Sequence, residues 1–266
     1  MREDARRVPK TRIFLGPTLP QEEARQIVDV EYFPPIRHDD LPLAAAEGVE
    51  VVGIIDAAFI HSYTATPTQI LECLRRGMVL FGAASAGALR AVETDRFGMR
   101  GVGGIYRLYK GGFEAEDELA VSYSPETLQP LSLAMINVRF ALAEAWEAGV
   151  IAESSHDGLV RASKAIYFAH RSWPAIFRRV TECVDPAELG RLSAFLDTKG
   201  SALDWKRADA IECLHEIRRY AEQYGGRADT LRRQADASAP GDDVATALAS
   251  RRDTERPPGL TPAIRP

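Results

Sequence analysis

Cysteine is scarce in this chain, and long apolar runs are absent. The 266 residues include three cysteines, Cys73, Cys183 and Cys213, which lie far apart and form no Cys-x-x-Cys pair. This odd and dispersed set predicts neither a disulfide framework nor a zinc site, and it suits a reducing compartment. No stretch of about 18 or more uncharged apolar residues exists, and residues 1–7 lack the apolar segment of a signal peptide. We therefore expect a cytoplasmic protein without a membrane span.

A strong charge of either sign is also missing. The formal net charge is −5, and hydrophobic and charged residues make up 45% and 27% of the chain. These values match a globular protein with a sizeable core, and they give no reason to expect nucleic-acid binding. Lysine is scarce as well, because nearly all basic residues are arginine; the only lysines are Lys10, Lys110, Lys164, Lys199 and Lys206.

The first half of the sequence alternates between strand-like and helix-like segments. Residues 50–56 form a near-continuous apolar run of the kind found in buried parallel strands, and Pro67 begins a helix that stops at Gly77. The order strand, helix, strand, helix predicts a parallel sheet with helices on its faces. We expect strands at 12–15, at 50–56 and from Met78 onward, and helices at 21–28, 41–47 and 67–76.

The second half is predicted to be helical. Apolar residues between 125 and 146 recur every three or four positions, as in an amphipathic helix. Further helices are expected at 163–168, 173–180, 186–196 and 202–224. The glycine-rich stretch 98–104 is interpreted as a loop, because it follows no strand and lacks the ending of a phosphate-binding motif. The chain thus divides into an α/β portion at 10–115, an all-helical portion at 116–225 and an expected disordered tail at 226–266, which is rich in proline, glycine and charge.

The segment around Ser85 joins an expected strand directly to an expected helix. This arrangement places the serine at the carboxyl end of a strand and the amino end of a helix, where open α/β sheets bind ligands. The free N–H groups of Ala86, Gly87 and Ala88 would point at a bound anion. The junction resembles a nucleophile elbow, although Ala83 stands where that motif has its first glycine. The alternative is that Ser85 only caps the helix.

A nucleophilic serine needs a group that accepts its proton. No histidine stands in an obvious partner position, so a lysine made neutral by burial is the other option. Lys206 lies on the apolar stripe of the helix expected at 202–224, with Asp209 one turn later as a ready ionic partner. The alternative is that Lys206 extends along this stripe to reach water.

Two further groups of polar residues stand out. Four carboxylates occur within residues 114–118, which is more typical of a solvated helix start or a surface for a basic partner than of a metal site. Asn137 and Arg139 lie inside a helix whose stripe is otherwise apolar, which suggests a pocket or an interface.

Several motifs together resemble the TfuA family, the partners of YcaO enzymes in making backbone thioamides. The match runs in order from about residue 12 to about residue 215. Its most specific parts are Ser-x-Gly-Ala-Leu-Arg-Ala at 85–91 and Gly-Met-x-Gly-Val-Gly at 98–103. The other matching segments are Phe-Leu-Gly-Pro-Thr-Leu at 14–19, Tyr-Phe-Pro-Pro at 32–35, Asp-Glu-Leu-Ala-Val at 117–121, Ala-Met-Ile-Asn-Val-Arg at 134–139 and Lys-Arg-Ala-Asp-Ala at 206–210.

The resemblance implies a hydrolase with a serine–lysine pair. Such proteins look like enzymes that act on the thiocarboxylated C-terminus of a small ubiquitin-like sulfur carrier and release sulfide to a YcaO enzyme, which uses ATP to activate the peptide amide. The implied setting is the biosynthesis of modified peptide natural products. The implied partners are a YcaO-type enzyme, the sulfur-carrier protein and, through the YcaO enzyme, a precursor peptide. Neither metal nor cofactor, nucleic acid nor membrane is implied.

The resemblance carries the serine over to Ser85. We infer the lysine at Lys206 from its place in the Lys-x-x-Asp-Ala segment and on the apolar stripe. Neutral Lys206 would take the proton of Ser85, and N–H groups near Ala86 and Gly87 would hold the oxyanion. The further candidates are Arg90, Asn137, Arg139 and Asp209 for substrate binding and Asp117 and Glu118 for a partner surface.

Other interpretations stay open at this point. Relatives often have a basic residue where this chain has Thr68, so the base could lie elsewhere, with Lys110 and the histidines as the next candidates. A non-catalytic adaptor that binds the YcaO enzyme and its peptide would use the same surfaces. A plain nucleotide-binding α/β protein is disfavoured by the missing phosphate motif.

Overall fold

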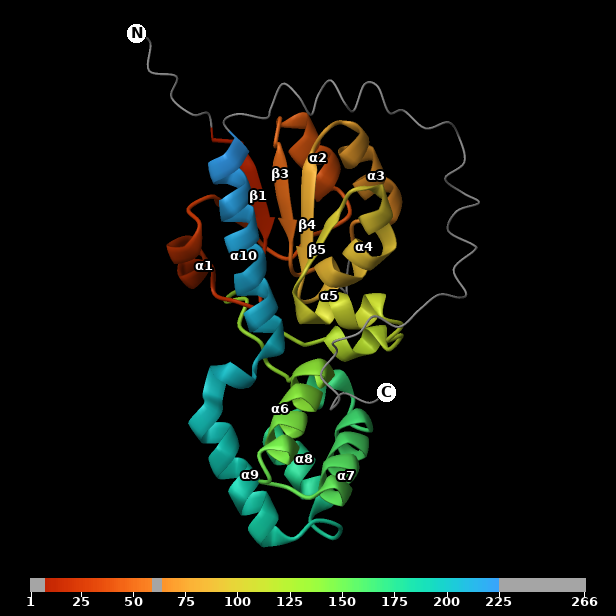
Figure 1. Ribbon diagram of the computed structural model, residues 1–266, viewed down its shortest axis with the longest axis vertical. Coiled ribbons are helices and arrows are strands. Elements are labelled where there is room, and N and C mark those ends of the chain that lie inside the picture. The colour runs from red at the N-terminus through yellow and green to blue at the C-terminus, as the bar shows by residue number, and fades with distance from the viewer. Residues whose placement is uncertain (1–7, 59–63, 225–266) are drawn as a thin grey trace.

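The computed structural model describes residues 8–58 and 64–224, so the tail predicted at 226–266 lies outside it. The α/β part is a five-stranded parallel sheet with the strand order β2-β1-β3-β4-β5. The strands are β1 (Thr11–Phe14), β2 (Glu31–Phe33), β3 (Val51–Ile54), β4 (Val79–Ala83) and β5 (Arg100–Val102). The prediction of an N-terminal parallel-sheet α/β portion followed by helices is confirmed (Figure 1).

Helices cover both faces of the sheet. They are α1 (Gln21–Ile27), α2 (Asp40–Ala46), α3 (Pro67–Arg75), α4 (Ala86–Thr94), α5 (Gly103–Lys110) and the long α10 (Trp205–Tyr224). Successive strand residues point to opposite faces, so they enter two separate cores. Ile13 and Val51 pack with α1 and α10, whereas Phe14 and Val52 pack with α2, α3 and α4.

The helices α6 (Met135–Glu147), α7 (Glu153–Lys164), α8 (Trp173–Val180) and α9 (Pro186–Lys199) form a helical lobe with its own core. This helical lobe lies beyond the end of the sheet at which the strand arrows terminate (Figure 1). The chain then returns, and α10 runs along the sheet beside α1. From the sequence α10 was predicted to belong to the helical portion, but Ala210, Leu214 and Ile217 on its apolar stripe complete the core of the sheet.

Local predictions were wrong where the hydrophobic pattern misled. The stretch 98–104 is not simply a loop, because it contains the edge strand β5 and the start of α5. The strand β5 was not predicted because it is only three residues long and contains a glycine, so it shows no apolar run. The helix expected at 125–146 begins only at Met135, and the preceding residues form a turn in which Tyr123 pairs with Pro130. Leu131 matched helical spacing by coincidence, since its side chain is 66% exposed.

The helix expected at 163–168 is also misplaced. The helix α7 instead spans Glu153–Lys164 and ends near the start of the expected range. The polar residues of α7 and Gly158 obscure its helical period in the sequence. No helix within the described ranges is long and apolar enough to cross a bilayer.

Candidate functional site

Ser85 occupies a strained turn between β4 and α4. As predicted, it lies directly between the carboxyl end of a strand and the amino end of a helix. The preceding Ala84 has a φ of 63°, a left-handed conformation that non-glycine residues rarely adopt. Strain at a sharp strand-to-helix turn is a property of nucleophile elbows. The turn leaves Ser85 only 3% exposed.

The side chain of Ser85 does not cap α4. Ser85 is the N-cap residue, yet its hydroxyl accepts no hydrogen bond from the helix, and no hydrogen bond to another described residue engages it. The hydroxyl is therefore not used to stabilise the start of the helix and is available to another partner. The interpretation of Ser85 as a mere helix cap is therefore wrong.

Two of the three N–H groups expected to face a ligand instead form hydrogen bonds within the protein. The Gly87 N–H donates to the Ile55 carbonyl oxygen at 3.3 Å, and the Ala88 N–H donates to the Ser85 carbonyl oxygen at 3.0 Å. Within the described ranges, only the Ala86 N–H of this set has no partner. Ala86 directly follows the serine, which is the position that supplies an oxyanion donor in nucleophile elbows.

Gly87 is needed for close packing rather than as a donor, which corrects its expected role. A Cβ atom at this position would lie 1.8 Å from the Ile54 carbonyl oxygen. Gly82 in β4 meets Gly87 in the same way, because its Cβ would lie 2.2 Å from the Gly87 oxygen. These glycines let the amino end of α4 approach β3 and β4 and thereby set the position of Ser85.

Gly87→Ala should destabilise the protein by about 3 kcal/mol, the upper end of the usual cost of overpacking, because the added methyl group overlaps a backbone oxygen that cannot easily move. Urea unfolding measures this change. Gly158→Ala is the matched control: a Cβ there meets nothing within 4 Å in α7, so stability should rise by roughly 0.5–1 kcal/mol. Equal effects of the two substitutions would contradict this account of Gly87.

Lys206 is buried at the start of α10, as its place on the apolar stripe predicts. Its side chain is 3% exposed, and its Nζ donates a hydrogen bond to the Leu119 carbonyl oxygen at 3.1 Å. The alternative, in which Lys206 extends along the apolar stripe to reach water, is therefore wrong. Burial lowers the pKa of the Lys206 amine, and the carboxylates of Asp56 and Asp204 oppose this shift. A lysine with a lowered pKa suits general-base chemistry.

Asp56, which was not predicted as a site residue from the sequence, links the surroundings of Ser85 and Lys206. It directly follows Ile55, whose carbonyl oxygen accepts the Gly87 N–H beside the serine. Its charge also raises the pKa of Lys206. A carboxylate directly after a buried apolar strand was the available signal, because that edge of the sheet is where ligands bind.

The carboxylate of Asp56 also fixes the loop that follows β1. Its Oδ2 accepts the N–H groups of Gly16 and Thr18, both at 3.0 Å, and its Oδ1 accepts the Thr18 hydroxyl at 2.6 Å. All three bonds are buried. The loop is thus held rigidly beside the lysine.

A small cavity of about 80 Å³ opens next to Lys206, between the sheet edge and the helical lobe. This volume equals that of two or three water molecules at roughly 30 Å³ each. Polar groups of Thr18, Ser132, Asn137 and Asp204 lie around it. Ser85 is not among its lining residues, so the cavity belongs to the lysine side of the site.

Asn137 holds the first turn of α10. Its Nδ2 donates to Asp204 Oδ1 at 2.7 Å, and its Oδ1 accepts the backbone N–H of Lys206 at 3.1 Å. Asp204 Oδ1 also accepts the Arg207 N–H at 2.9 Å. The predicted pocket residue therefore does lie at the site, where it anchors the helix that carries Lys206.

Asp209 does not pair with Lys206, which corrects the expected ionic contact. Its carboxylate accepts the N–H groups of Gly104 and Ile105 at 2.8 and 2.7 Å, at the amino end of α5. Burial raises the pKa of Asp209 to about 6, although these two bonds act in the opposite direction. A Cβ at Gly103 would lie 2.2 Å from the Asp209 Cγ, so the contact is tight. Asp209 therefore ties α10 to α5 rather than binding substrate.

Glu118 and Arg139 pair with each other. The Arg139 Nε and Nη2 donate to the Glu118 carboxylate at 2.7 and 2.8 Å, and Lys164 Nζ lies 3.1 Å from it. Glu118 is 0% exposed, so its predicted place at a partner surface is wrong. The arginine and the lysine, from α6 and α7, supply the charges that allow its burial. Asp117 does lie at the surface, with a 69% exposed side chain that pairs with Lys164.

The remaining candidates do not improve on Lys206 as a base. Lys110 Nζ donates to Asp95 at 2.6 Å, and this bond raises the pKa of Lys110, which keeps the amine charged at neutral pH. Thr68 is exposed in the first turn of α3. Arg90 is half-buried and forms an ion pair with Glu93 within α4.

In the part of the chain that the structure describes, no group of three or more His, Cys, Asp or Glu side chains could hold a metal ion.

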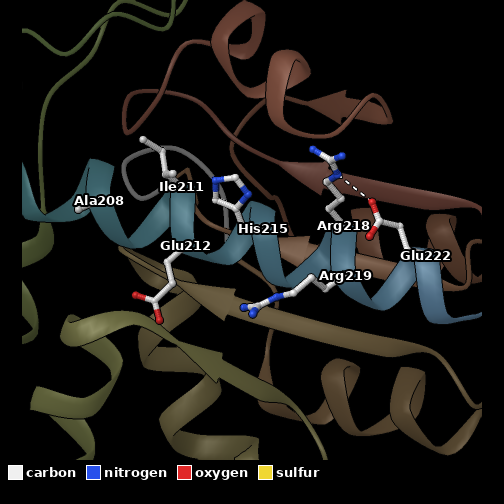
Figure 2. A pocket seen from close by; sticks show the side chains of 7 residues that line it. All are labelled: Ala208, Ile211, Glu212, His215, Arg218, Arg219 and Glu222. Atoms are coloured by element: carbon white, nitrogen blue, oxygen red, sulfur yellow. Dashed lines mark hydrogen bonds and ion pairs between the residues drawn. The ribbon is translucent and has the colours of Figure 1, made fainter.

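A wider groove of about 700 Å³ runs along the outward side of α10. Figure 2 shows its lining side chains along this helix, with Arg218 and Glu222 joined in an exposed ion pair. Neither Ser85, Lys206 nor any residue predicted to bind substrate lines this groove, although His215, one of the histidines considered as an alternative base, does. It is therefore separate from the Ser85 and Lys206 site.

The fold and site together define an α/β protein with a buried serine on a strained turn and a buried lysine, both toward the carboxyl edge of a parallel sheet. The family model for TfuA-like protein matches residues 56–172, from Asp56 through the Ser85 turn to the helical lobe. This match confirms the recognition of the chain as TfuA-like, and that likeness associates it with thioamidation, in which TfuA-like proteins are accessories of YcaO-type enzymes. A comparison with curated proteins found no match. Lys206 lies outside the matched residues.

Proposed function

We propose that the protein is an accessory hydrolase of peptide backbone thioamidation, which releases sulfide from a thiocarboxylated sulfur-carrier protein for a partner YcaO-type enzyme. The observation that carries this proposal is the Ser85 hydroxyl, which is buried on a strained strand-to-helix turn and does not cap the helix. The family resemblance supplies the substrate class.

Lys206 serves as the general base in this proposal. A neutral amine that donates one hydrogen to the Leu119 carbonyl oxygen keeps its lone pair for the proton of Ser85. As the proton leaves, Ser85 Oγ attacks the thiocarboxylate carbon. The C–S bond then breaks, the proton passes from Lys206 to the sulfur, and hydrosulfide departs. Water hydrolyses the resulting ester, which regenerates the serine and leaves the carrier with a carboxylate.

The amino end of α4 stabilises the charge that develops on the carbonyl oxygen. The Ala86 N–H has no partner among the described residues and can donate to that oxygen, and the loss of one such donor typically costs roughly 3 kcal/mol. The nine-residue helix also favours an anion at its amino end. Arg90, one turn further along, forms an ion pair with Glu93 on the same helix, so the helix end and the Ala86 N–H rather than Arg90 supply this stabilisation.

Mass spectrometry of the intact protein tests this proposal. Mixing with the thiocarboxylated carrier should produce a covalent adduct whose mass equals the sum of both proteins minus hydrogen sulfide, with the ester on Ser85. The Ser85→Ala variant should show no adduct. Sulfide release that proceeds without an ester on Ser85 in rapidly quenched samples would contradict the mechanism. An adaptor would show neither adduct nor sulfide.

Asp117→Lys should weaken the binding of the YcaO-type partner or of the carrier by roughly fivefold at physiological salt, since an exposed charge contributes at most about 1 kcal/mol. The substitution reverses an exposed charge and removes the pair with Lys164. Isothermal titration calorimetry measures the affinity. Asp197→Lys, which reverses an exposed charge on α9, is the control and should leave the affinity unchanged. Unaltered affinity for Asp117→Lys would leave Asp117 as a solvated residue.

A further inference from the structure

The hydrogen-bond acceptor of Lys206 is supplied by a short 3₁₀ turn, Glu116–Leu119. Among the described residues, the only hydrogen bond of Lys206 Nζ goes to the Leu119 carbonyl oxygen. The Leu119 side chain is itself buried, in a core that it shares with residues of α4, α5 and α6. The place of this one carbonyl group therefore decides where the lysine amine is held.

The residue before Leu119 is held by ion pairs from two helices. Arg139 in α6 grips both carboxylate oxygens of Glu118, and Lys164 in α7 approaches one of them. A two-point contact between a planar guanidinium group and a carboxylate fixes orientation as well as distance. A buried ion pair contributes little net stability because its charges lose their hydration, whereas its geometry holds the two groups that form it in place.

We propose that the Glu118–Arg139 ion pair is a positioning device for Lys206, because it fixes the adjacent Leu119 carbonyl group that accepts the hydrogen bond of the lysine amine. Through this pair, the helical lobe sets the placement of an amine on α10. Glu118 and Arg139 thus act through Leu119 and are positioning residues. The effect on sulfide release rests on the proposed function, whereas the placement of Lys206 does not.

The other groups that face Lys206 act differently. The carboxylates of Asp56, after β3, and Asp204, before α10, raise the pKa of Lys206 through their charges. Asn137 from α6 accepts a hydrogen bond from the backbone N–H of Lys206, and Thr18 after β1 is neutral. None of these groups replaces the hydrogen bond to Leu119. Loosening the Glu118–Arg139 pair should therefore remove an acceptor that favours the charged amine and lower the pKa of Lys206 further.

Arg139→Lys tests the proposal with a mild change. It keeps the positive charge but loses the two-point grip on Glu118. Sulfide release should fall roughly 10- to 100-fold, as small misplacements of catalytic groups do, and the rising limb of its pH profile should move to lower pH. Glu118→Gln, which keeps the shape and loses the charge, should shift the limb in the same direction. Glu222→Gln removes an exposed ion pair on α10 and should change neither quantity.

The pH dependence of the free energy of unfolding provides a readout that needs no hydrolase activity. In the wild type, stability rises with pH above the lowered pKa of Lys206, because the unfolded chain then binds a proton that the folded protein does not. In Arg139→Lys this rise in stability should begin at lower pH. In a protein that also carries Lys206→Met, Arg139→Lys should no longer change how the free energy of unfolding depends on pH.

The two readouts separate the possible failures. If no variant and no wild-type protein releases sulfide, the proposed hydrolase function fails, while the onset of the stability rise still tests the positioning of Lys206. Arg139→Lys and Glu118→Gln could lower stability or activity and yet leave unchanged both the rising limb of the pH profile of sulfide release and the pH at which stability begins to rise. In that case the ion pair is only structural, and the inference is overturned.

Discussion

Ser85→Ala should fold like the wild type and lose sulfide release by at least about 1000-fold, because removal of a catalytic nucleophile commonly costs several orders of magnitude in rate. The fold should tolerate the change since the hydroxyl makes no capping hydrogen bond. Stability should therefore change little, which circular dichroism and urea unfolding would show. Sulfide is measured directly after addition of the thiocarboxylated carrier.

Ser163→Ala is the matched control for this variant. Ser163 is also a buried serine, but it lies in α7, and its hydroxyl donates to the Leu159 carbonyl oxygen at 2.7 Å. Its replacement should lower stability by about 1 kcal/mol and leave sulfide release intact. If Ser85→Ala keeps activity within tenfold of the wild type, a difference of about 1.4 kcal/mol in the barrier, Ser85 is not the nucleophile.

Lys206→Met should also abolish turnover, with stability within about 2 kcal/mol of the wild type. Methionine keeps the apolar stem and removes the cost of burying an amine, while the Leu119 carbonyl group loses its hydrogen bond. The activity of the wild type should rise with pH through the lowered pKa of Lys206, because only the neutral amine accepts a proton.

The same substitution should change how stability depends on pH. The ordinary pKa of the lysine side chain is 10.5, and burial lowers it in the folded protein. Between these two values the unfolded chain binds more protons, so the stability of the wild type rises with pH across this window. Lys206→Met should remove that rise, as urea unfolding at a series of pH values would show.

Lys110→Met is the matched control for Lys206→Met. The Lys110 amine is exposed and paired with Asp95, and its pKa is raised, so it should contribute nothing to proton transfer. Activity and its pH profile should be unchanged. Normal turnover in Lys206→Met together with lost turnover in Lys110→Met would move the base to Lys110.

The residue pattern predicted those parts of the site that depend on local sequence. An apolar run that passes through small residues into helix formers placed Ser85 correctly between β4 and α4. A stripe of apolar residues predicted the burial of Lys206, because the helical period of that segment is regular. The family resemblance joined these two distant residues into one hypothesis.

The parts that were missed depend on contacts between distant segments. Asp56 accepts hydrogen bonds from the loop after β1, about 40 residues earlier, and no local pattern shows such a contact. Glu118 lies in an acidic run of the kind that is usually exposed. Its burial is possible because Arg139 in α6 and Lys164 in α7 neutralise its charge. The edge strand β5 is too short to produce a hydrophobic period, and for that reason it was interpreted as a loop.

Sulfide release by the purified protein with thiocarboxylated carrier alone, in the absence of any YcaO-type enzyme, peptide or ATP, tests the central claim most directly. The proposed hydrolase should release one equivalent of sulfide per carrier, with repeated turnover, and convert the carrier thiocarboxylate to a carboxylate. If sulfide appears only when the YcaO-type enzyme is added, and Ser85→Ala supports that release as well as the wild type, the protein is an adaptor and the account is contradicted.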